Sequence, residues 1–561
     1  MMRAYALALT VLFHCTAAAY AEGKQGADPA SSQPVVLQQG ERIYLEGILP
    51  SGEPLQAVVK GDIPVVGTAF SCVSCHLRSG LGSLEGGVIT PPTTGKKLYQ
   101  PLYAGRERTH SERMNVPTYF QSIARRPAYT DETLADSLRM GINPEGRELN
   151  SVMPRYLLDD RDMGILISYL KSLSAESSPG VTETTLRFAT IVTEGVSAED
   201  REAMLAPLQT YVAARNNQSK SFQTRAKYGV FAEEMDLSYR KLSLSVWELK
   251  GPAETWRAQL EEYYRKEPVF ALLGGIAAGE WKPIHVFSEE HRIPCIFPIT
   301  DFPVISETDW YTLYFSKGIY QEGEAVANHL ARMEQLSAEN SVLQLVQNSR
   351  AGRALQAGFE STWQELGRRP PVTITLTEDQ TIARDFLQRL VEREKPAVIL
   401  LWTDAGAMPA LEKLAAPAAR PQRVYLSSSL LKQGLWTIPE PMRDIAFLAY
   451  PYRLPQEEAA YSNYARGLLR GKNTPIDDRR ISTRMYSLVR LMTEIFMHIQ
   501  RHYYRDYFLD VISMLSDQKY PDFVRLSFGP GQRYASKGCY IVQLTQGPRP
   551  ELVRRSDWVI Y

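Results

Sequence analysis

The sequence predicts a multidomain protein in which a small all-α domain precedes a two-lobed α/β domain. Strand patterns are scarce before the polar stretch at residues 172–183, where helical patterns and Gly/Pro-rich loops prevail. After that stretch, strand and helix patterns alternate, which is typical of parallel sheets covered by helices. The alternating part extends from about residue 185 to 561 and exceeds a single core of about 250–300 residues, so we expect two sheets.

The composition excludes several classes of protein. Lys+Arg and Asp+Glu both number 63, and 44% of the residues are hydrophobic. A chain with this apolar content and no charge excess does not have the composition of a disordered protein. It also lacks the net basic charge expected of a nucleic-acid-binding protein. Five cysteines are too few for a disulfide scaffold of 561 residues.

The first 21 residues have the pattern of a secretory signal peptide. Arg3 provides a basic start, the run from Ala4 to Ala19 is mostly apolar and small, and Ala19-Tyr20-Ala21 is a small-x-small cleavage site. The alternative is an uncleaved membrane anchor, although the run is short for spanning a bilayer. No later run is long and apolar enough to span one. We therefore expect export to the periplasm without a stable membrane span.

The all-α domain is expected at residues 35–175. Helical patterns occur at Asp131–Gly141 and Asp159–Leu173, and the second begins with an acidic first turn. Its apolar residues recur at helical spacing: Met163, Leu166, Ile167 and Leu170. Because a small domain buries little apolar surface, a bound cofactor would help to complete its core.

The sequence Cys72-Val73-Ser74-Cys75-His76 carries the strongest chemical signal in the chain. Two thiols at this spacing can add to the vinyl groups of haem, and the adjacent His can reach the iron. A zinc half-site would need two further ligands, and only His110 is nearby. A redox dithiol is expected at a strand-to-helix turn of a βαβ unit, not in a loop-rich helical region. We therefore predict one covalently attached haem c on Cys72 and Cys75.

Residues 35–175 resemble the small monohaem c-type cytochromes of the class I-like kind. The resemblance rests on the Cys72–His76 motif, on Val152-Met153-Pro154-Arg155-Tyr156 and on the helical pattern ending in Tyr169-Leu170-Lys171. It implies that His76 and Met153 are the axial ligands of the haem iron. A thioether opposite His closes the iron to other ligands and suits electron transfer.

Other residues are alternatives for the sixth ligand or have structural roles. His110 is the rival ligand, although its neighbours Arg106, Arg108 and Arg113 favour a solvated loop. Met140, Met163 and Met114 are expected to pack in the core.

A linker at residues 176–184 precedes the α/β domain at 185–561. The expected strands are Leu186–Thr193, Leu242–Leu249, Val269–Ile276, Cys295–Ile299, Ser341–Gln347, Val372–Leu376, Ala397–Trp402, Arg423–Ser427 and Ile445–Tyr450. The expected helices between them are Ala198–Arg215, Ala253–Lys266, Gln321–Gln335, Arg353–Leu366, Ala383–Glu394 and Ala405–Leu414. The C-terminal part predicts helices at Ser482–His502 and Asp506–Asp517, then a hairpin-like strand pair at Phe523–Phe528 and Gly538–Leu544.

This second domain resembles the type 1 periplasmic binding proteins, particularly the branched-chain amino-acid receptors. The resemblance rests on segments such as Phe270–Ile276, Arg292–Pro298 and Gly352–Phe359. It implies two α/β lobes around a ligand cleft at the carboxyl ends of the strands. It places Thr300 and Asp301 at that cleft.

The resemblance also assigns Ala277-Ala278-Gly279, Ala351 and Asp404 to the cleft. Because hydroxyl-rich and aromatic residues of the receptors are not matched there, amino-acid binding does not follow. Cys295 and Cys539 can either pair or remain separate buried thiols, and we expect the second.

The sequence therefore predicts an exported monohaem c-type cytochrome for electron transfer, fused to a ligand- or partner-binding module. The sequence contains no nucleophile, metal-protease or phosphate-loop motif, so we do not expect an enzyme. The expected partner is a redox protein, such as a periplasmic dehydrogenase or another cytochrome, and a small-molecule ligand of the cleft is possible. The alternative is a solute-binding receptor of the ABC-transporter type with a redox-sensing haem domain.

Overall fold

A computed structural model describes residues 33–85, 88–102, 126–226, 240–333, 342–415, 420–457, 480–499, 502–529 and 531–560. These residues form two compact units. The first comprises the described residues up to His76 and from Gly82 to Ala175, and the second comprises Leu77–Leu81 and the described residues from Glu176 onward. No described helix has the length and apolar character needed to cross a membrane. The predicted signal peptide and His110 lie outside the described residues.

Helices are the main regular elements of the first unit. The longer ones are α1 (Gln33–Glu46), α5 (Asp131–Met140) and α6 (Asp160–Ser172), and the short ones are α2 (Val73–His76) and α3 (Gly95–Leu98). Local chemistry sets the helix ends. Thr130 and Thr133 form a capping box at the start of α5, and Asp159 caps α6 by accepting a hydrogen bond from the Asp162 backbone N–H.

The prediction of an all-α domain is wrong, because the first unit also contains short strands. β1 (Gln56–Val59) pairs antiparallel with β2 (Ile63–Val66) and with β5 (Arg155–Tyr156). β3 (Leu84–Glu85) pairs with β4 (Val88–Ile89). The hairpin has a physical signature in the sequence, since valine pairs flank a turn in which Gly61 and Asp62 both take positive φ.

The first unit has its own hydrophobic core, where α1 packs against α6. The two helices approach closely at Gly40, where an added Cβ would lie 2.5 Å from the Cβ of Tyr169 and 2.8 Å from the Ile165 carbonyl oxygen. Glycine therefore sets the distance between the helices. Met163 is buried in this core as expected, but Met140 is 51% exposed. Met140 is the last residue of α5 and lies off the face that buries Leu134 and Leu138.

The second unit begins with an α/β lobe around a parallel sheet of strand order β10-β9-β8-β6-β7. Its strands are β6 (Thr185–Thr193), β7 (Lys241–Leu249), β8 (Ala271–Leu273), β9 (Cys295–Ile296) and β10 (Thr312–Leu313). Its helices include α7 (Ala198–Ala226), α9 (Trp256–Lys266) and α10 (Lys282–Glu290). Alternate residues of β6 enter opposite cores, with Phe188 and Val192 on one face and Ala189 and Ile191 on the other.

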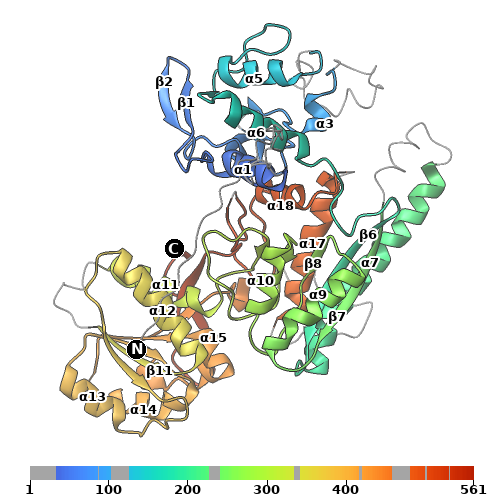
Figure 1. Cartoon of the computed structure of the whole chain (residues 1–561). Coiled ribbons are helices and arrows are strands. Elements are labelled where there is room, and N and C mark those ends of the chain that lie inside the picture. Colours follow the sequence, from blue (N-terminus) through green and yellow to red (C-terminus); the bar gives the residue numbers. More distant parts are fainter. Residues whose placement is uncertain are drawn as a thin grey trace, which may run out of the picture. The chain divides into compact units, whose positions relative to one another are not determined.

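The second lobe is built around a sheet of strand order β12-β11-β13-β14-β15-β16-β17. β11 (Val342–Gln347), β12 (Val372–Leu376), β13 (Val398–Trp402), β14 (Arg423–Ser427) and β15 (Ala446–Tyr450) are parallel. As Figure 1 shows, α11 (Ile319–Ala331) and α12 (Arg350–Glu365) cover one face, and α13 (Phe386–Glu394) and α14 (Met408–Glu412) cover the other. The alternating strand–helix prediction is thus confirmed for both lobes.

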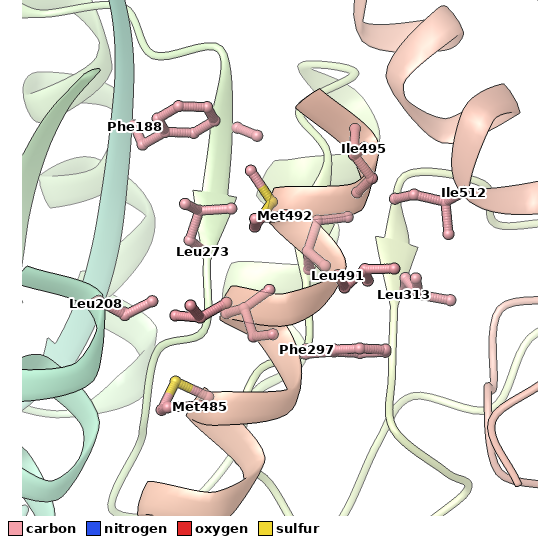
Figure 2. Packing of buried hydrophobic residues seen from close by; sticks show 14 of the residues in the cluster. Phe188, Leu208, Leu273, Phe297, Leu313, Met485, Leu491, Met492, Ile495 and Ile512 are labelled. Atoms are coloured by element: carbon pink, nitrogen blue, oxygen red, sulfur yellow. The ribbon is translucent and has the colours of Figure 1, made fainter. Parts of the chain in front are cut away.

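Near its C-terminus the chain contributes again to both lobes. α17 (Ile481–Ile499) and α18 (Arg505–Met514) pack in the first-lobe core, where Met485, Leu491 and Met492 belong to one hydrophobic cluster with the strand residues Leu273 and Leu313 (Figure 2). β16 (Gly538–Leu544), β17 (Leu552–Arg554) and β18 (Val559–Ile560) then complete the second-lobe sheet.

The predicted hairpin between residues 523–528 and 538–544 is wrong in its pairing. β16 pairs antiparallel with β15, β17 and β18, and residues 523–528 form no strand. Cys295 on β9 and Cys539 on β16 are buried and form no disulfide with each other.

We predict that Gly40→Ala destabilises the first unit by about 1–3 kcal/mol, because the added methyl group overpacks the contact between α1 and α6. Gly164→Ala on α6 is the matched control. No atom lies within 4 Å of the Cβ position there, so the helix should be unchanged or stabilised by about 0.5–1 kcal/mol. Urea unfolding followed by far-ultraviolet circular dichroism measures both variants. Equal stability of the two variants would contradict the close approach at Gly40.

Candidate functional sites

The first unit contains an apolar cavity that brings together all the predicted haem residues. Its unfilled space is about 1150 Å³, including the part that opens to solvent. The residues predicted from the sequence that line it are Cys72, Cys75, His76 and Met153. Most other walls are apolar side chains from several elements: Phe70, Leu98, Tyr129, Leu134, Leu138, Leu149, Val152, Tyr156 and Leu170.

The short helix α2 fixes the two cysteines and His76 on one turn of backbone. The His76 backbone N–H donates to the Cys72 carbonyl over 2.9 Å. The His76 Nδ1 lies 2.9 Å from the Pro91 carbonyl oxygen. Since a carbonyl only accepts, Nδ1 carries the proton, and the neutral ring keeps a lone pair on Nε2. Burial lowers the pKa of His76, which favours this neutral form.

The two thiols have different surroundings. Cys72 is buried and Cys75 is exposed, so one edge of the cavity reaches the surface of the first unit. Burial raises the pKa of Cys72 to about 11, which keeps this thiol protonated at neutral pH. Its Sγ lies 4.0 Å from the Tyr156 hydroxyl, which donates to the Phe70 carbonyl over 3.1 Å.

The Met153 loop is held by a local turn. The Asn150 side chain accepts a hydrogen bond from the Val152 backbone N–H over 3.1 Å, and the Asn150 carbonyl accepts one from the Met153 N–H over 2.9 Å. Pro154 follows and is buried. The half-buried Met153 side chain packs against the core of the first unit and lines the cavity.

The residues of this cavity fit a haem group. The walls of the cavity are apolar except for a few polar groups, which is the usual composition of a site for a small molecule or cofactor. An imidazole with a free Nε2 and a thioether are both ligands that haem iron accepts. The described residues contain no cluster of three or more His, Cys, Asp or Glu suited to a bare metal ion.

The second unit contains a polar cleft that includes both predicted cleft residues. Thr300 and Asp301 line it, in the loop that follows β9. Its unfilled space is about 410 Å³ including the open part. The other lining residues come from both lobes: Pro298, Pro303, Tyr314, Phe315, Ser316, Gly318, Ile319, Ser429, Pro451, Tyr452 and Arg484. Gly318 is required at the start of α11, because it has a φ of +63° and an added Cβ would lie 2.2 Å from the Asp301 carbonyl oxygen.

Hydroxyl groups of the cleft are positioned by backbone bonds. The Thr300 hydroxyl accepts from the Phe302 N–H over 3.1 Å, and the Ser316 hydroxyl accepts from the Gly318 N–H over 3.1 Å. Because each hydroxyl keeps its own proton, both can still donate to a ligand.

Arg484 on α17 is the one cleft-lining residue with a buried cationic side chain. It is 8% exposed, and its Nη2 donates to the Tyr452 hydroxyl over 2.8 Å. Burial acts to lower its pKa, but Tyr452, Asp301 and Asp522 act against this and raise it above the ordinary value. The guanidinium is therefore charged.

Glu322 on α11 lies behind the cleft. It is fully buried, and its Oε2 accepts from the backbone N–H of Ser429 over 3.5 Å. Burial raises the pKa of this carboxyl to about 7. Its protonation state therefore changes near neutral pH.

Several residues assigned to the cleft by resemblance lie elsewhere. Asp404 caps the 3₁₀ helix Ala405–Ala407 by accepting from the Gly406 N–H over 2.8 Å. Ala351 packs against the second-lobe core, and Ala277 against the first-lobe core. The Ala277–Gly279 loop, Ala351 and Asp404 do not line this cleft.

The sequence analysis missed Ser429, Tyr452 and Arg484. Each lies far along the chain from Thr300, and only the return of α17 to the first lobe brings Arg484 to the cleft. The available signal was a pair of arginines four residues apart, with Arg480 immediately before α17 and Arg484 in its first turn.

No protein-family model and no curated protein matches the chain. Solved structures with a similar arrangement include an ABC transporter substrate-binding protein from Sphaerobacter thermophilus, with 12% identity, a TM-score of 0.47, and coverage of 67% of this chain and 98% of that chain. Another is a putative branched-chain amino acid ABC transporter from Rhodospirillum rubrum, with 14% identity, a TM-score of 0.46 and coverage of 68% and 100%. A third is a fatty acid ABC transporter substrate-binding protein from Thermomonospora curvata, with 14% identity, a TM-score of 0.44 and coverage of 69% and 95%.

We predict that the stability of the second unit falls as the pH rises from about 4.5 to about 7, in part because of Glu322. Its folded pKa of about 7 lies above the ordinary 4.5, so in this range the folded state holds a proton that the unfolded state has lost. Glu322→Gln should therefore reduce the slope of unfolding free energy against pH.

Tryptophan fluorescence measures this transition selectively, because all eight tryptophans of the chain lie between residues 247 and 558. Urea unfolding at pH 5 and pH 8 gives the slope. The control is Glu412→Gln, which removes an exposed carboxylate from α14. An identical slope in wild type and Glu322→Gln would contradict the prediction.

Proposed function

We propose that this protein is an exported electron-transfer protein with one covalent haem c in its first unit and a small-molecule-binding cleft in its second. The observation that carries the proposal is the convergence of Cys72, Cys75, His76 and Met153 on one apolar cavity. These residues are separated by up to about 80 positions in the sequence, and sequence motifs alone predict each of them.

The residues of the cavity have distinct roles in this proposal. When bound, haem supplies one-electron oxidation and reduction at its iron. The Pro91 carbonyl fixes the His76 tautomer, so that Nε2 is the nitrogen offered to the iron. The Asn150 turn holds Met153 at the cavity wall. Apolar walls such as Leu134 and Leu170 exclude water, which favours electron transfer over chemistry at an open iron.

The cleft supports the second part of the proposal. It is lined by residues of both lobes and combines apolar walls with a few fixed polar groups, which is the usual composition of a ligand site. The alternative function, a solute-binding receptor with a redox-sensing haem, would use the same two sites. Electron exchange with a periplasmic redox partner, such as a dehydrogenase or another cytochrome, would favour the electron carrier. Ligand-dependent change in reduction potential without electron exchange with a partner would favour the receptor.

We predict that protein exported by a host with haem-attachment machinery carries one haem that acid–acetone does not extract. Mass spectrometry of the intact protein should show the mass of one added haem. Cys72→Ala and Cys75→Ala together should abolish the addition, because no thiol remains to form a thioether bond. Cys295→Ala is the control, since that buried cysteine lies in the second unit. Release of all colour on extraction would overturn the proposal.

We predict that Met153 closes the sixth coordination position. The oxidised protein should show a weak near-infrared sulfur-to-iron band, and Met153→Ala should lose this band and bind carbon monoxide when reduced. Met163→Leu is the matched control, because Met163 is buried in the same unit but does not line the cavity. Ready carbon monoxide binding by the unaltered protein would instead indicate an open iron and contradict the role of Met153.

A further inference from the structure

The Arg484 guanidinium lacks a full set of partners although it is more than nine-tenths buried. Its Nε makes no hydrogen bond. Among the residues that the structure describes, no carboxylate forms an ion pair with it within 4 Å. A buried charge without an ion-pair partner is costly, because its desolvation is not offset by a direct contact with an opposite charge. Asp301 raises the Arg484 pKa by its charge but stays beyond ion-pair distance.

The neighbouring Arg480 has the ion-pair partner that Arg484 lacks within the described part of the chain. Arg480 lies four residues earlier, immediately before α17, and its Nη1 contacts the fully buried Asp522 carboxylate at 3.2 Å. Both guanidinium groups lie over the ring of Tyr452, at 4.9 Å for Arg480 and 5.7 Å for Arg484. Arg480 thus has a carboxylate within ion-pair distance and Arg484 has none among the described residues, and Arg484 is the one that lines the cleft.

We infer that Arg484 is the anchor for the carboxylate of a small monocarboxylic acid bound in the cleft. This inference rests on the proposed binding function of the second unit and names the class of ligand. A guanidinium offers parallel N–H donors that match the two oxygens of a carboxylate. The hydroxyls of Thr300 and Ser316 supply neutral donors nearby.

The rest of the lining sets limits on the acid. Phe315, Pro298 and Pro451 provide apolar walls for a short carbon skeleton. The exposed Asp301 carboxylate disfavours a second negative charge on the ligand, so dicarboxylates and phosphate should bind less well. The enclosed part of the cleft is small, so the lobes must separate to admit the acid.

The test uses the full-length haem-loaded protein and a fixed set of probes. Acetate, propionate, lactate and benzoate are compared with their neutral amides and with inorganic phosphate. Binding is followed by tryptophan fluorescence and by the melting temperature of the second unit. We expect at least one carboxylate to bind and its amide to bind at least tenfold more weakly.

Two variants of α17 separate the anchoring role from a general effect of charge. Arg484→Gln should weaken carboxylate binding at least tenfold, whereas Arg490→Gln, which removes an exposed cation from the same helix, should leave it unchanged. Without ligand, Arg484→Gln should melt at the same temperature or higher, because it removes an uncompensated buried charge. Arg484→Lys keeps the charge but not the paired donors, and it should bind with intermediate affinity.

Each outcome decides the inference. Equal binding of acid and amide, unchanged affinity in Arg484→Gln, tighter binding of phosphate, or no binding of any carboxylate overturns it. If a probe binds in a way that depends on Thr300 and Asp301 but not on Arg484, the proposed cleft function stands and only the carboxylate anchor fails. Should Arg484→Gln not fold, Arg484→Lys and Thr300→Ala supply the affinity comparison, and unchanged carboxylate affinity in Arg484→Lys overturns the inference.

Discussion

The packing of α17 into the first lobe is the contact on which the second unit depends. α17 follows the second-lobe strand β15 in the chain, yet its apolar face completes the first-lobe core with Met485, Leu488 and Met492. Burial of each such side chain contributes about 1.5–3 kcal/mol. The segment therefore cannot leave the first lobe without exposing a large part of that core, and the two lobes are joined by more than one passage of the chain.

The same helix also provides charge to the cleft. Arg480 immediately precedes α17 and Arg484 lies in its first turn, whereas the apolar residues that fill the core continue along the helix to Ile499. Both contact Tyr452, which follows the second-lobe strand β15. A helix held firmly by its apolar face can keep a guanidinium at a fixed position, and a fixed donor is what a selective binding site needs.

Local patterns predicted much of the fold and part of both sites. The strands expected in the α/β domain were predictable because runs such as Ala397–Trp402 are short and rich in β-branched or aromatic residues. Helical patterns lie between most of these runs in the sequence. The front hairpin was missed because its strands are only four residues long. The pairing of residues 523–528 was wrong because β16 finds a better partner in β15, which lies about 90 positions earlier in the chain. A short-range pattern cannot reveal such a partner.

The two candidate sites differ in how far a local sequence pattern could reveal their residues. Cys72, Cys75 and His76 are adjacent in sequence, so their shared chemistry was visible as a motif, and Met153 followed from the order of elements. Arg484 belongs to no motif, and its importance comes from burial and from the absence of an ion-pair partner within 4 Å among the described residues. Sequence patterns report groups that act together locally, whereas an unpaired buried charge is a property of the folded chain.

The first unit poses a further physical constraint, because its cavity and its core share walls. Cys72, Leu134, Leu138 and Leu170 belong both to the hydrophobic core and to the lining of the cavity. An unfilled apolar cavity costs stability in proportion to its volume, since the side chains around it lose their contacts. A flat apolar group bound to Cys72 and Cys75 would restore those contacts. Ligation by His76 and Met153 would then join α2 to the loop before α6, so that folding of this unit and attachment of its group would stabilise each other.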